Sequence, residues 1–258
     1  ATPSNRTFGI EAEFFGITPS TAVAALNAVG IACSFEGYTH RVMTGWKIVT
    51  DGSVTSTGTG TGGLELVSPI LQGEAGLAQA SLAVSTLLRA GGRVDRTCGL
   101  HVHVGMNGLN GAEIMKVLDL YSANQSHINT IIARSRQSNG YCRPLNLGNG
   151  VRQNGYEAVR QARTASDISR VASGFGRYSV VNISAYAKYG TIEFRQHQGT
   201  LNAKKVEGWV KFVLAVVEAG AAGHTAGFAS LAEMTAGIGL DTDTQTYLSS
   251  RQARLARA

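Results

Sequence analysis

Three short stretches of the chain place two ionisable residues two positions apart. They read E-A-E at 11–13, H-V-H at 101–103 and E-F-R at 193–195. Because side chains alternate across a β-strand, both ionisable residues of each stretch project from one face and the middle residue from the other. If these strands share a sheet, one surface carries three carboxylates, two imidazoles and a guanidinium. This inventory suits divalent metal and phosphate, so a ligase or phosphoryl-transfer site is our first hypothesis.

A solvated strand face is the alternative interpretation, because amphipathic strands also alternate and a lone E-x-E usually marks such a face. The three stretches argue against it, since their exposed positions hold no Lys, Ser or Thr. Their flanks are also tight and apolar, as in F-G-I at 8–10 and G-L at 99–100. Together the three stretches favour a functional surface.

The candidate ligands indicate which cation would bind. Glu11, Glu13, Glu65 and Glu193 with His101 form a set rich in oxygen, which favours Mg²⁺ or Mn²⁺ over structural zinc. Zinc at His101 and His103 remains the competing assignment, although a third imidazole has no obvious candidate. No C-x-x-C occurs, so a thiolate zinc site is not expected.

Composition bounds the class of protein. A chain of 258 residues with 43% hydrophobic and 16% charged residues is globular and large enough to bury a sizeable core. The net charge of +6 suits an anionic ligand such as a nucleotide. Nucleic acid is not expected as a partner, because the basic residues are scattered and no RNP or zinc-finger pattern occurs. Three irregularly spaced cysteines, no leader-like segment and no apolar run of membrane-spanning length predict a cytoplasmic protein without a membrane anchor.

The order of elements predicts alternating strands and helices within one domain spanning 1–258. We expect strands at 8–15, 31–38, 45–50, 64–67, 99–105, 178–185 and 190–196, with 31–38 and 45–50 in a meander and the last two in a hairpin. We expect helices at 19–30, 74–90, 110–132 and 202–219. A further helix should follow a loop at 140–155 and end at about 172, and the tail from about 227 should be helical and peripheral. In 74–90 the predicted core residues are Leu77, Leu82, Leu87 and Leu88. The Thr/Gly run at 55–63 is either a hairpin loop or a loop that covers substrate.

The ordered motifs G-I-E-A-E, D-G-S, G-L-E-L-V-S-P, G-L-H-V-H-V and T-I-E-F-R resemble the amidoligase family of the carboxylate–amine ligase superfamily. Glutamine synthetase and glutamate–cysteine ligase are better-known relatives. The resemblance spans roughly residues 8–201. It implies an α+β fold with a curved, mainly antiparallel sheet forming a half-barrel, and helices packed on its outer face. It also implies ATP and Mg²⁺ (or Mn²⁺) as cofactors, and a carboxylate and an amine as substrates that are joined through an acyl phosphate.

The resemblance also implies roles for individual residues. Glu13 and Glu65 would hold one metal ion, and Glu11, His101 and Glu193 the other. Arg195 would stabilise the γ-phosphate as charge develops, with His103 beside the phosphates or the carboxylate. Asp51 would orient or deprotonate the amine, or only cap the turn at Gly52. The implied substrate-binding residues are Arg143, as a carboxylate clamp, Tyr141 and Asn182.

Two other functions compete with a ligase. A metal-dependent hydrolase would use the same carboxylates and imidazoles to activate water. A catalytically inactive relative would serve as a binding module. The complete ligand set argues against the second alternative, because an inactive copy has no chemical need for all of these residues together.

Overall fold

The computed structural model describes residues 4–39, 41–55, 62–145 and 151–257, and the chain divides into two units. The strand-rich unit comprises residues 7–102 and 197–210, and the helix-rich unit comprises 1–6, 103–196 and 211–258. Strands β6 and β8 each have residues in both units. We describe each unit by itself. Most of the Thr/Gly run, at 56–61, lies outside the described residues, and the prediction of a single domain stays a prediction.

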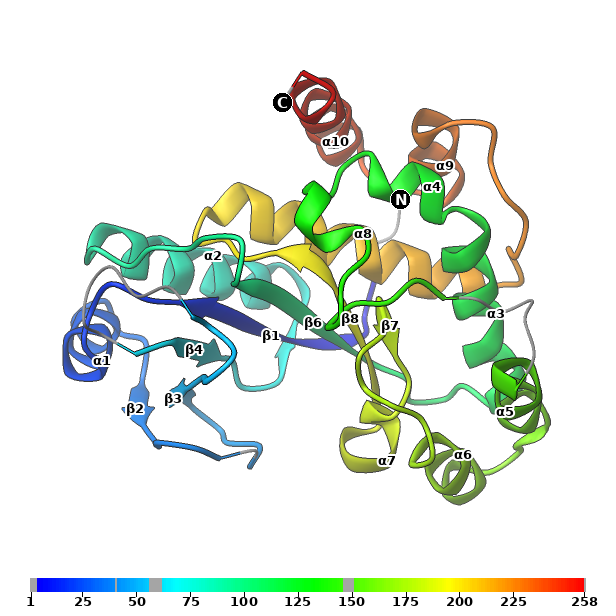
Figure 1. Cartoon of the computed structure of the whole chain (residues 1–258), viewed down its shortest axis with the longest axis horizontal. Helices are drawn as coiled ribbons and strands as arrows, with labels where there is room; N and C mark the ends of the chain where they lie inside the picture. The colour runs from blue at the N-terminus through cyan, green and yellow to red at the C-terminus, as the bar shows by residue number, and fades with distance from the viewer. Residues whose placement is uncertain (1–3, 40, 56–61, 146–150, 258) are drawn as a thin grey trace. The chain divides into compact units, whose positions relative to one another are not determined.

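The strand-rich unit has the strand order β2-β3-β4-β1-β6, with β5 also paired to β1 (Figure 1). The strands are β1 (Thr7–Phe14), β2 (Cys33–Phe35), β3 (Trp46–Thr50), β4 (Leu64–Val67), β5 (Leu71–Gln72) and β6 (Gly99–Gly105). Strand β1 pairs antiparallel with β4 and β5, and β3 pairs antiparallel with β4. The predicted meander of 31–38 and 45–50 is wrong, because β2 and β3 run parallel and parallel neighbours cannot be joined by a tight hairpin.

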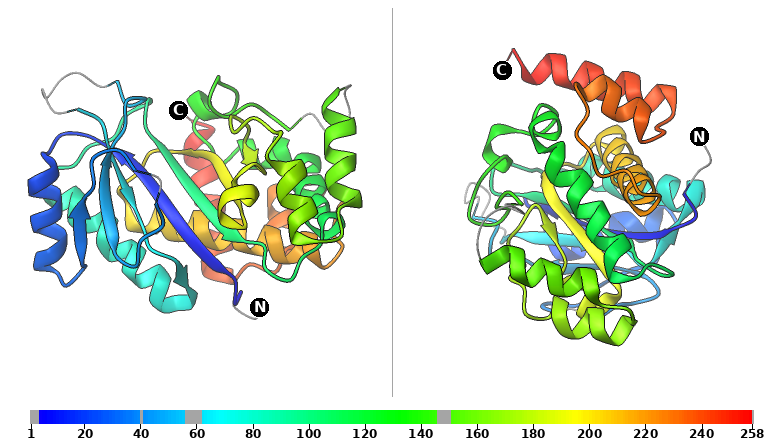
Figure 2. Two further views of the ribbon diagram at one scale, coloured as in Figure 1. Left: turned by 90° about the horizontal axis from the view of Figure 1, so that it is seen from below. Right: turned by 90° about the vertical axis from the view of Figure 1, so that its right-hand side faces the viewer.

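Two helices cover strands of this unit. Helix α1 (Pro19–Ala28) contacts β2 and β3, as the left view of Figure 2 shows in blue, and helix α2 (Gly73–Arg89) contacts β1 and β5. Thr18 caps α1 by accepting a hydrogen bond from the Thr21 amide at 3.1 Å. In α2, Leu77 and Leu87 are buried as predicted.

Leu82 and Leu88, predicted as core residues of α2, are instead 40% and 50% exposed. Leu82 lies opposite the stripe of buried residues that helical periodicity creates, and Leu88 lies at its margin in the last turn. Apolar character alone therefore overstated the width of the buried face.

Strand β1 separates its two faces by simple alternation. Phe8, Ile10, Ala12 and Phe14 are at most 2% exposed and form the apolar side, whereas Glu11 belongs to the opposite side. The burial of four apolar side chains fixes the register, because a slip of one residue would exchange the faces. The packing of the core therefore dictates where the carboxylates of this strand point.

The helix-rich unit has the strand order β6-β8-β7, with β7 (Val181–Asn182) antiparallel to β8 (Thr191–Gln198). Its helices are α3 (Gly111–Ala123), α4 (Gln125–Asn129), a 3₁₀ turn η1 (Arg134–Arg136), α5 (Val151–Gln161), α6 (Ala165–Ala172), α7 (Ala185–Tyr189), α8 (Ala203–Ala221, shared with the other unit), α9 (Leu231–Gly237) and α10 (Thr242–Leu255). Several boundaries differ from prediction. Helix α5 begins inside the expected loop 140–155, the predicted strand 178–185 is strand only at Val181–Asn182, and the short helix α7 joins the predicted hairpin strands.

Helix α3 begins as predicted but ends earlier. Asn110 and Glu113 form a complete capping box at its start. The predicted continuation to 132 stops at Asn124, which is fully buried. Its side chain donates to Leu120 O at 2.8 Å and accepts from the Phe228 amide at 2.8 Å. The Asn124 side chain thus occupies the Leu120 carbonyl, which a continuing helix would bond through the Asn124 amide, and joins the end of α3 to the C-terminal segment.

The segment after residue 227 is helical, as predicted, with α9 and α10 in mutual contact (Figure 2, right). Helix α10 is anchored by Arg251, whose Nε donates to Ile131 O at 2.6 Å. Each unit combines helices with mainly antiparallel strands, so the predicted α+β class is confirmed, while the half-barrel curvature stays a prediction. Among the described residues, no helix is long and apolar enough to cross a membrane.

Candidate functional site

Five residues of the strand-rich unit bring their ligand atoms together. Glu11, Glu65 and His101 form one group, and Glu13, Asp51 and Glu65 form another, with the ligand atoms of each group within 4.8 Å of one another. We refer to these five residues as the carboxylate cluster. They come from β1, β4, β6 and the turn after β3, so pairing of neighbouring strands assembles the cluster.

Strand register places two of the carboxylates directly opposite each other. Glu13 on β1 faces Glu65 on β4, and Glu13 is only 6% exposed. Like charges directly opposite on antiparallel strands destabilise the pair. One partial compensation is the amide of Gly99, which donates to Glu13 Oε2 at 2.5 Å. A bound cation would remove the remaining repulsion.

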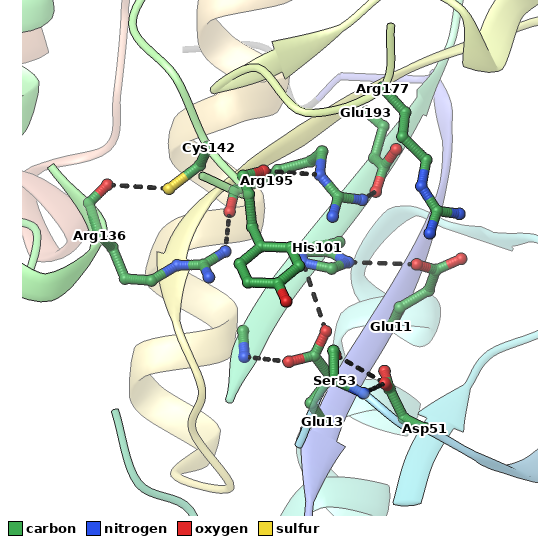
Figure 3. A network of polar contacts seen from close by, with 12 residues as sticks. Glu11, Glu13, Asp51, Ser53, His101, Arg136, Cys142, Arg177, Glu193 and Arg195 are labelled. Atoms are coloured by element: carbon green, nitrogen blue, oxygen red, sulfur yellow. Dashed lines mark hydrogen bonds and ion pairs between the residues drawn. The ribbon is translucent and has the colours of Figure 1, made fainter. Parts of the chain in front are cut away.

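His101 lies between the two carboxylates of β1, as Figure 3 shows, and is 3% exposed. Its Nδ1 lies 3.3 Å from Glu11 Oε2, and its Nε2 lies 3.7 Å from Glu13 Oε1. Ligand atoms sharing one ion, each at about 2.0–2.6 Å from it, lie roughly 3–4 Å apart. Because the two ring nitrogens point in different directions, each has a spacing that fits a shared cation only with its own neighbouring carboxylate, Nδ1 with Glu11 and Nε2 with Glu13.

Asp51 caps its own turn, one of the two roles expected for it. Its Oδ1 accepts from the Ser53 amide at 2.7 Å and from the Ser53 hydroxyl at 2.6 Å. It also belongs to the cation-binding geometry with Glu13 and Glu65, which the sequence reasoning missed. The available signal was its place directly after the strand that pairs with Glu65 through Val49.

The composition of the carboxylate cluster matches a hard divalent cation. Four carboxylates and one imidazole supply mainly oxygen donors, as Mg²⁺ and Mn²⁺ require. Cys98, beside Gly99, does not add a thiolate, because burial, and secondarily the charge of Glu13, raises the pKa of its thiol to about 11. Cys33, Cys98 and Cys142 are free thiols.

In the helix-rich unit, β8 presents a buried ion pair. Glu193 and Arg195 are 4% and 8% exposed, and Arg195 Nη1 contacts Glu193 Oε1 (Figure 3). Arg195 Nε donates to Tyr141 O at 3.4 Å, and Asn182 Nδ2 donates to Glu193 Oε2 at 2.6 Å. The guanidinium is thus oriented by two acceptors before any ligand binds.

His103 lies at the same pair. Its Nδ1 is 2.9 Å from Thr191 Oγ1, and its Nε2 is 4.0 Å from Glu193 Oε1. The ring of Tyr189 meets His103 edge-on at 5.7 Å between centroids. The Thr191 hydroxyl therefore fixes one ring nitrogen and leaves the other directed at the carboxylate.

The three residues expected to bind substrate differ in accessibility. The side chains of Arg143 and Tyr141 are exposed, and Tyr141 packs edge-on against Tyr178. Asn182 is buried; its Oδ1 accepts from the Ser184 amide at 2.9 Å while its Nδ2 holds Glu193. Its observed contacts orient Glu193, so its predicted contact with substrate stays a prediction.

The structure assembles the expected residues in two groups. The carboxylate cluster gathers Glu11, Glu13, Glu65 and His101, and the β8 group gathers His103, Glu193 and Arg195. Joint coordination of a cation by Glu11, His101 and Glu193 stays a prediction.

Gly199 supports the position of Gly99 and gives a first prediction. Its amide donates to Cys98 O at 2.7 Å, and a Cβ at Gly199 would lie 2.3 Å from Cys98 Cβ. Gly199→Ala should therefore lower the free energy of unfolding by about 1–3 kcal/mol, measured from the urea midpoint. Gly52→Ala is the control, because a Cβ there meets no atom of the described residues within 4 Å. Equal midpoints for the two variants would contradict the prediction.

Comparison with known proteins adds a family match. The chain matches the model of a family described as "Putative amidoligase enzyme" over residues 4–217, a range that includes every candidate residue above. A solved structure described as "GmaS/ADP complex-Conformation 1" aligns with 99% of this chain and 68% of its own, at 12% sequence identity and a TM-score of 0.44. No curated protein matches the chain.

Proposed function

Because the chain belongs to the amidoligase family and is therefore a ligase, we propose that it joins a carboxylate to an amine in an ATP-dependent reaction. A carboxylate oxygen of the substrate would attack the γ-phosphorus, breaking its bond to ADP and giving an acyl phosphate. The amine nitrogen would then attack the acyl carbon, inorganic phosphate would leave, and the nitrogen would lose a proton. The net products are an amide, ADP and phosphate.

The carboxylate cluster is the observation that carries this proposal. Glu13 and Glu65, with Asp51 as a further donor, would hold one Mg²⁺ or Mn²⁺, supported by their ligand atoms lying within 4.8 Å of one another. Glu11 and His101 would hold a second ion, with Glu193 as the proposed third ligand. Such ions neutralise phosphate charge when bound. The chain's own part is to present the donors on strands whose register is fixed by a buried apolar face.

Arg195 would stabilise the charge that develops on the transferred phosphoryl group. A guanidinium suits this role because its planar donors match phosphate oxygens in pairs. Glu193 and the carbonyl of Tyr141 already orient it, so little reorganisation accompanies the reaction. His103, whose Nε2 is directed at Glu193, would lie beside the phosphates.

Substrate recognition would use Arg143 and Tyr141, whose exposed side chains suit a carboxylate and its apolar neighbour. Asn182 would act indirectly, through its hydrogen bond to Glu193. Asp51, held by its hydrogen bonds from Ser53, would orient the amine in addition to its proposed role as a metal ligand. The reduced thiols of the chain are consistent with a cytoplasmic location, which we retain as part of the proposal.

Nucleotide binding gives the second prediction and tests the function. Millimolar Mg²⁺-ATP should raise the melting temperature, because a ligand that binds only the native state stabilises it by mass action, by about 2.7 kcal/mol at 100 times its Kd. Differential scanning fluorimetry with ATP alone, Mg²⁺ alone and both together measures this. No shift with Mg²⁺-ATP or Mn²⁺-ATP would contradict the proposal and favour an inactive module.

Turnover identifies the reaction class. The protein should release ADP from ATP when it is given pools of amino acids, peptides, polyamines and cell-wall peptides that include both an acid and an amine. Mass spectrometry should then detect a product whose mass is the sum of the two substrates minus one water. Release of phosphate from phosphoesters without ATP would instead support the hydrolase. An Asp51→Asn control, which retains an oxygen to accept from Ser53, separates the proposed chemistry from turn capping.

A further inference from the structure

The main-chain carbonyl of Arg195 lies where strand pairing stops. In an antiparallel ladder, a hydrogen-bonded pair of residues exchanges two bonds. Arg195 donates its amide to Val180 O at 2.9 Å, but the Val180 amide donates to Arg143 O at 2.9 Å instead of returning a bond to Arg195. Strand β7 is only two residues long, Val181–Asn182. The Val180 amide is therefore engaged with Arg143, and the exchange of bonds with Arg195 is incomplete.

The side chain of Arg136 donates to this carbonyl. Its Nη2 donates to Arg195 O at 2.6 Å, and the Arg136 side chain points at this carbonyl in Figure 3. Arg136 lies in η1 and is 4% exposed. The turn that carries it is itself held, because Cys142 Sγ donates to Arg136 O at 3.2 Å. A side chain thus completes the edge of the strand at the residue proposed to meet phosphate.

The burial of the Arg136 guanidinium lowers the stability of the fold. Within the described part of the chain, Arg136 has no carboxylate within ion-pairing distance, and its Nε is buried without a hydrogen-bond partner. Burying a guanidinium without a counter-charge lowers stability, and an apolar side chain of similar volume often costs less. Stability alone therefore does not account for an arginine at position 136, and its bond to Arg195 suggests a role in placing that residue.

The next residue of β8 is fixed as well. The side chain of Gln196, fully buried, accepts from Tyr121 Oη at 2.6 Å and donates to Asn129 Oδ1 at 2.6 Å. Arg195 itself is held through its main chain, because its amide donates to Val180 O and its carbonyl accepts from Arg136. Loss of the Arg136 bond would remove a side-chain anchor from the Arg195 carbonyl.

We propose that Arg136 is a positioning residue for Arg195, which fixes the main chain of β8 so that the Arg195 guanidinium meets the transferred phosphoryl group in the productive orientation. The inference rests on the function proposed above. Misplacement of a reacting group by about 1 Å can cost 10²-fold in rate. Arg136→Met should accordingly lower kcat by about 10–100-fold while changing KM for ATP little. Arg136→Lys, which can still donate one hydrogen bond, should lose less.

Arg251 provides a matched control. It is also a buried arginine, 5% exposed, that donates to a main-chain carbonyl at 2.6 Å, that of Ile131. Arg251→Met removes the same type of bond outside the proposed site. It should lower the melting temperature at least as much as Arg136→Met and leave kcat unchanged.

A binding measurement tests the position of Arg195 without turnover. Calorimetry would compare Mg²⁺-ADP with Mg²⁺-ADP plus tetrafluoroaluminate, a mimic of the phosphoryl group in transfer. We expect Arg136→Met to weaken the second affinity at least tenfold and to leave the first unchanged, with Arg136→Lys intermediate. If Arg136→Met does not fold, the same comparison is made with Arg136→Lys against Arg251→Lys.

The outcomes separate the two proposals. Equal effects of the Arg136 and Arg251 variants on kcat and on the fluoroaluminate affinity, with an active wild type, would overturn the positioning role and leave the ligase function standing. A wild type that neither binds Mg²⁺-ADP nor releases ADP from ATP would overturn the proposed function and the positioning role with it.

Discussion

Replacing Arg195 by lysine should lower the rate of ADP release by about 10²–10³-fold, or about 3–4 kcal/mol of activation free energy. Lysine keeps the positive charge but loses the planar pair of donors that matches phosphate oxygens. Folding should change little, since Glu193 can still pair with the ammonium group and β8 keeps its main-chain bonds to Val180 and Arg136. The expected defect is therefore in kcat rather than in stability.

Arg160→Lys is the matched control for this experiment. Arg160 donates both terminal nitrogens to Asp119, at 3.1 and 3.3 Å, joining α5 to α3. Arg160→Lys likewise loses the planar pair of donors that binds a carboxylate, and the Arg160–Asp119 ion pair is about one-third exposed. Arg160 has no proposed contact with substrate, so steady-state ADP release should match the wild type. Equal rates for Arg195→Lys and Arg160→Lys would remove Arg195 from the mechanism.

Strand alternation accounts for what the sequence predicted best. The period of two in β1 separates Phe8, Ile10, Ala12 and Phe14 from Glu11, and the buried face leaves only one register. The pairing of Glu13 with Glu65 follows from that register once β4 is the neighbour of β1. Local pattern and core packing agree within β1, so the face that carries its carboxylates could be predicted, whereas the pairing of Glu13 with Glu65 required the strand order.

Features set by distant parts of the chain could not be predicted in this way. The direction of β2 against β3 depends on how the chain returns, which no local pattern encodes. Helix α3 ends where Asn124 bonds to the segment at Phe228, 104 residues later. Arg136 is a similar case. In the sequence it is one of several scattered arginines, and its bond to the Arg195 carbonyl depends on the Val180 amide, just before β7, donating to Arg143.

Asp51 shows a subtler limit. Its D-G-S turn is visible in the sequence and its bonds to Ser53 follow from turn chemistry. Its carboxylate comes close to Glu13 and Glu65 only because β3 pairs with β4, which brings the turn to them. A sufficient local explanation therefore hides a proximity to other carboxylates that only the tertiary structure reveals.

Glu65→Gln should have opposite effects on stability with and without metal. Without divalent cations the variant should be as stable as the wild type or more so, by up to about 1 kcal/mol, because Glu65 faces Glu13 across β1 and β4 and the amide removes one of two like charges. With Mg²⁺ or Mn²⁺ at about 100 times the wild-type Kd, the wild type should gain about 2.7 kcal/mol. The variant should lose most of that gain, since Glu65 belongs to both ligand groups of the carboxylate cluster.

Urea denaturation with EDTA and with increasing Mn²⁺ measures both effects in one series. Glu36→Gln is the control, because Glu36 is an exposed carboxylate of the same unit that accepts from the nearby Ser34 hydroxyl at 2.7 Å. It should keep the wild-type response to Mn²⁺ and show no gain in EDTA. A variant that is at least as stable as the wild type in EDTA but less stable in Mn²⁺ identifies Glu65 as a metal ligand. Removal of a structural carboxylate would instead destabilise the protein under both conditions. A Mn²⁺-dependent gain in Glu65→Gln equal to that of Glu36→Gln would show that the cluster does not bind the cation through Glu65.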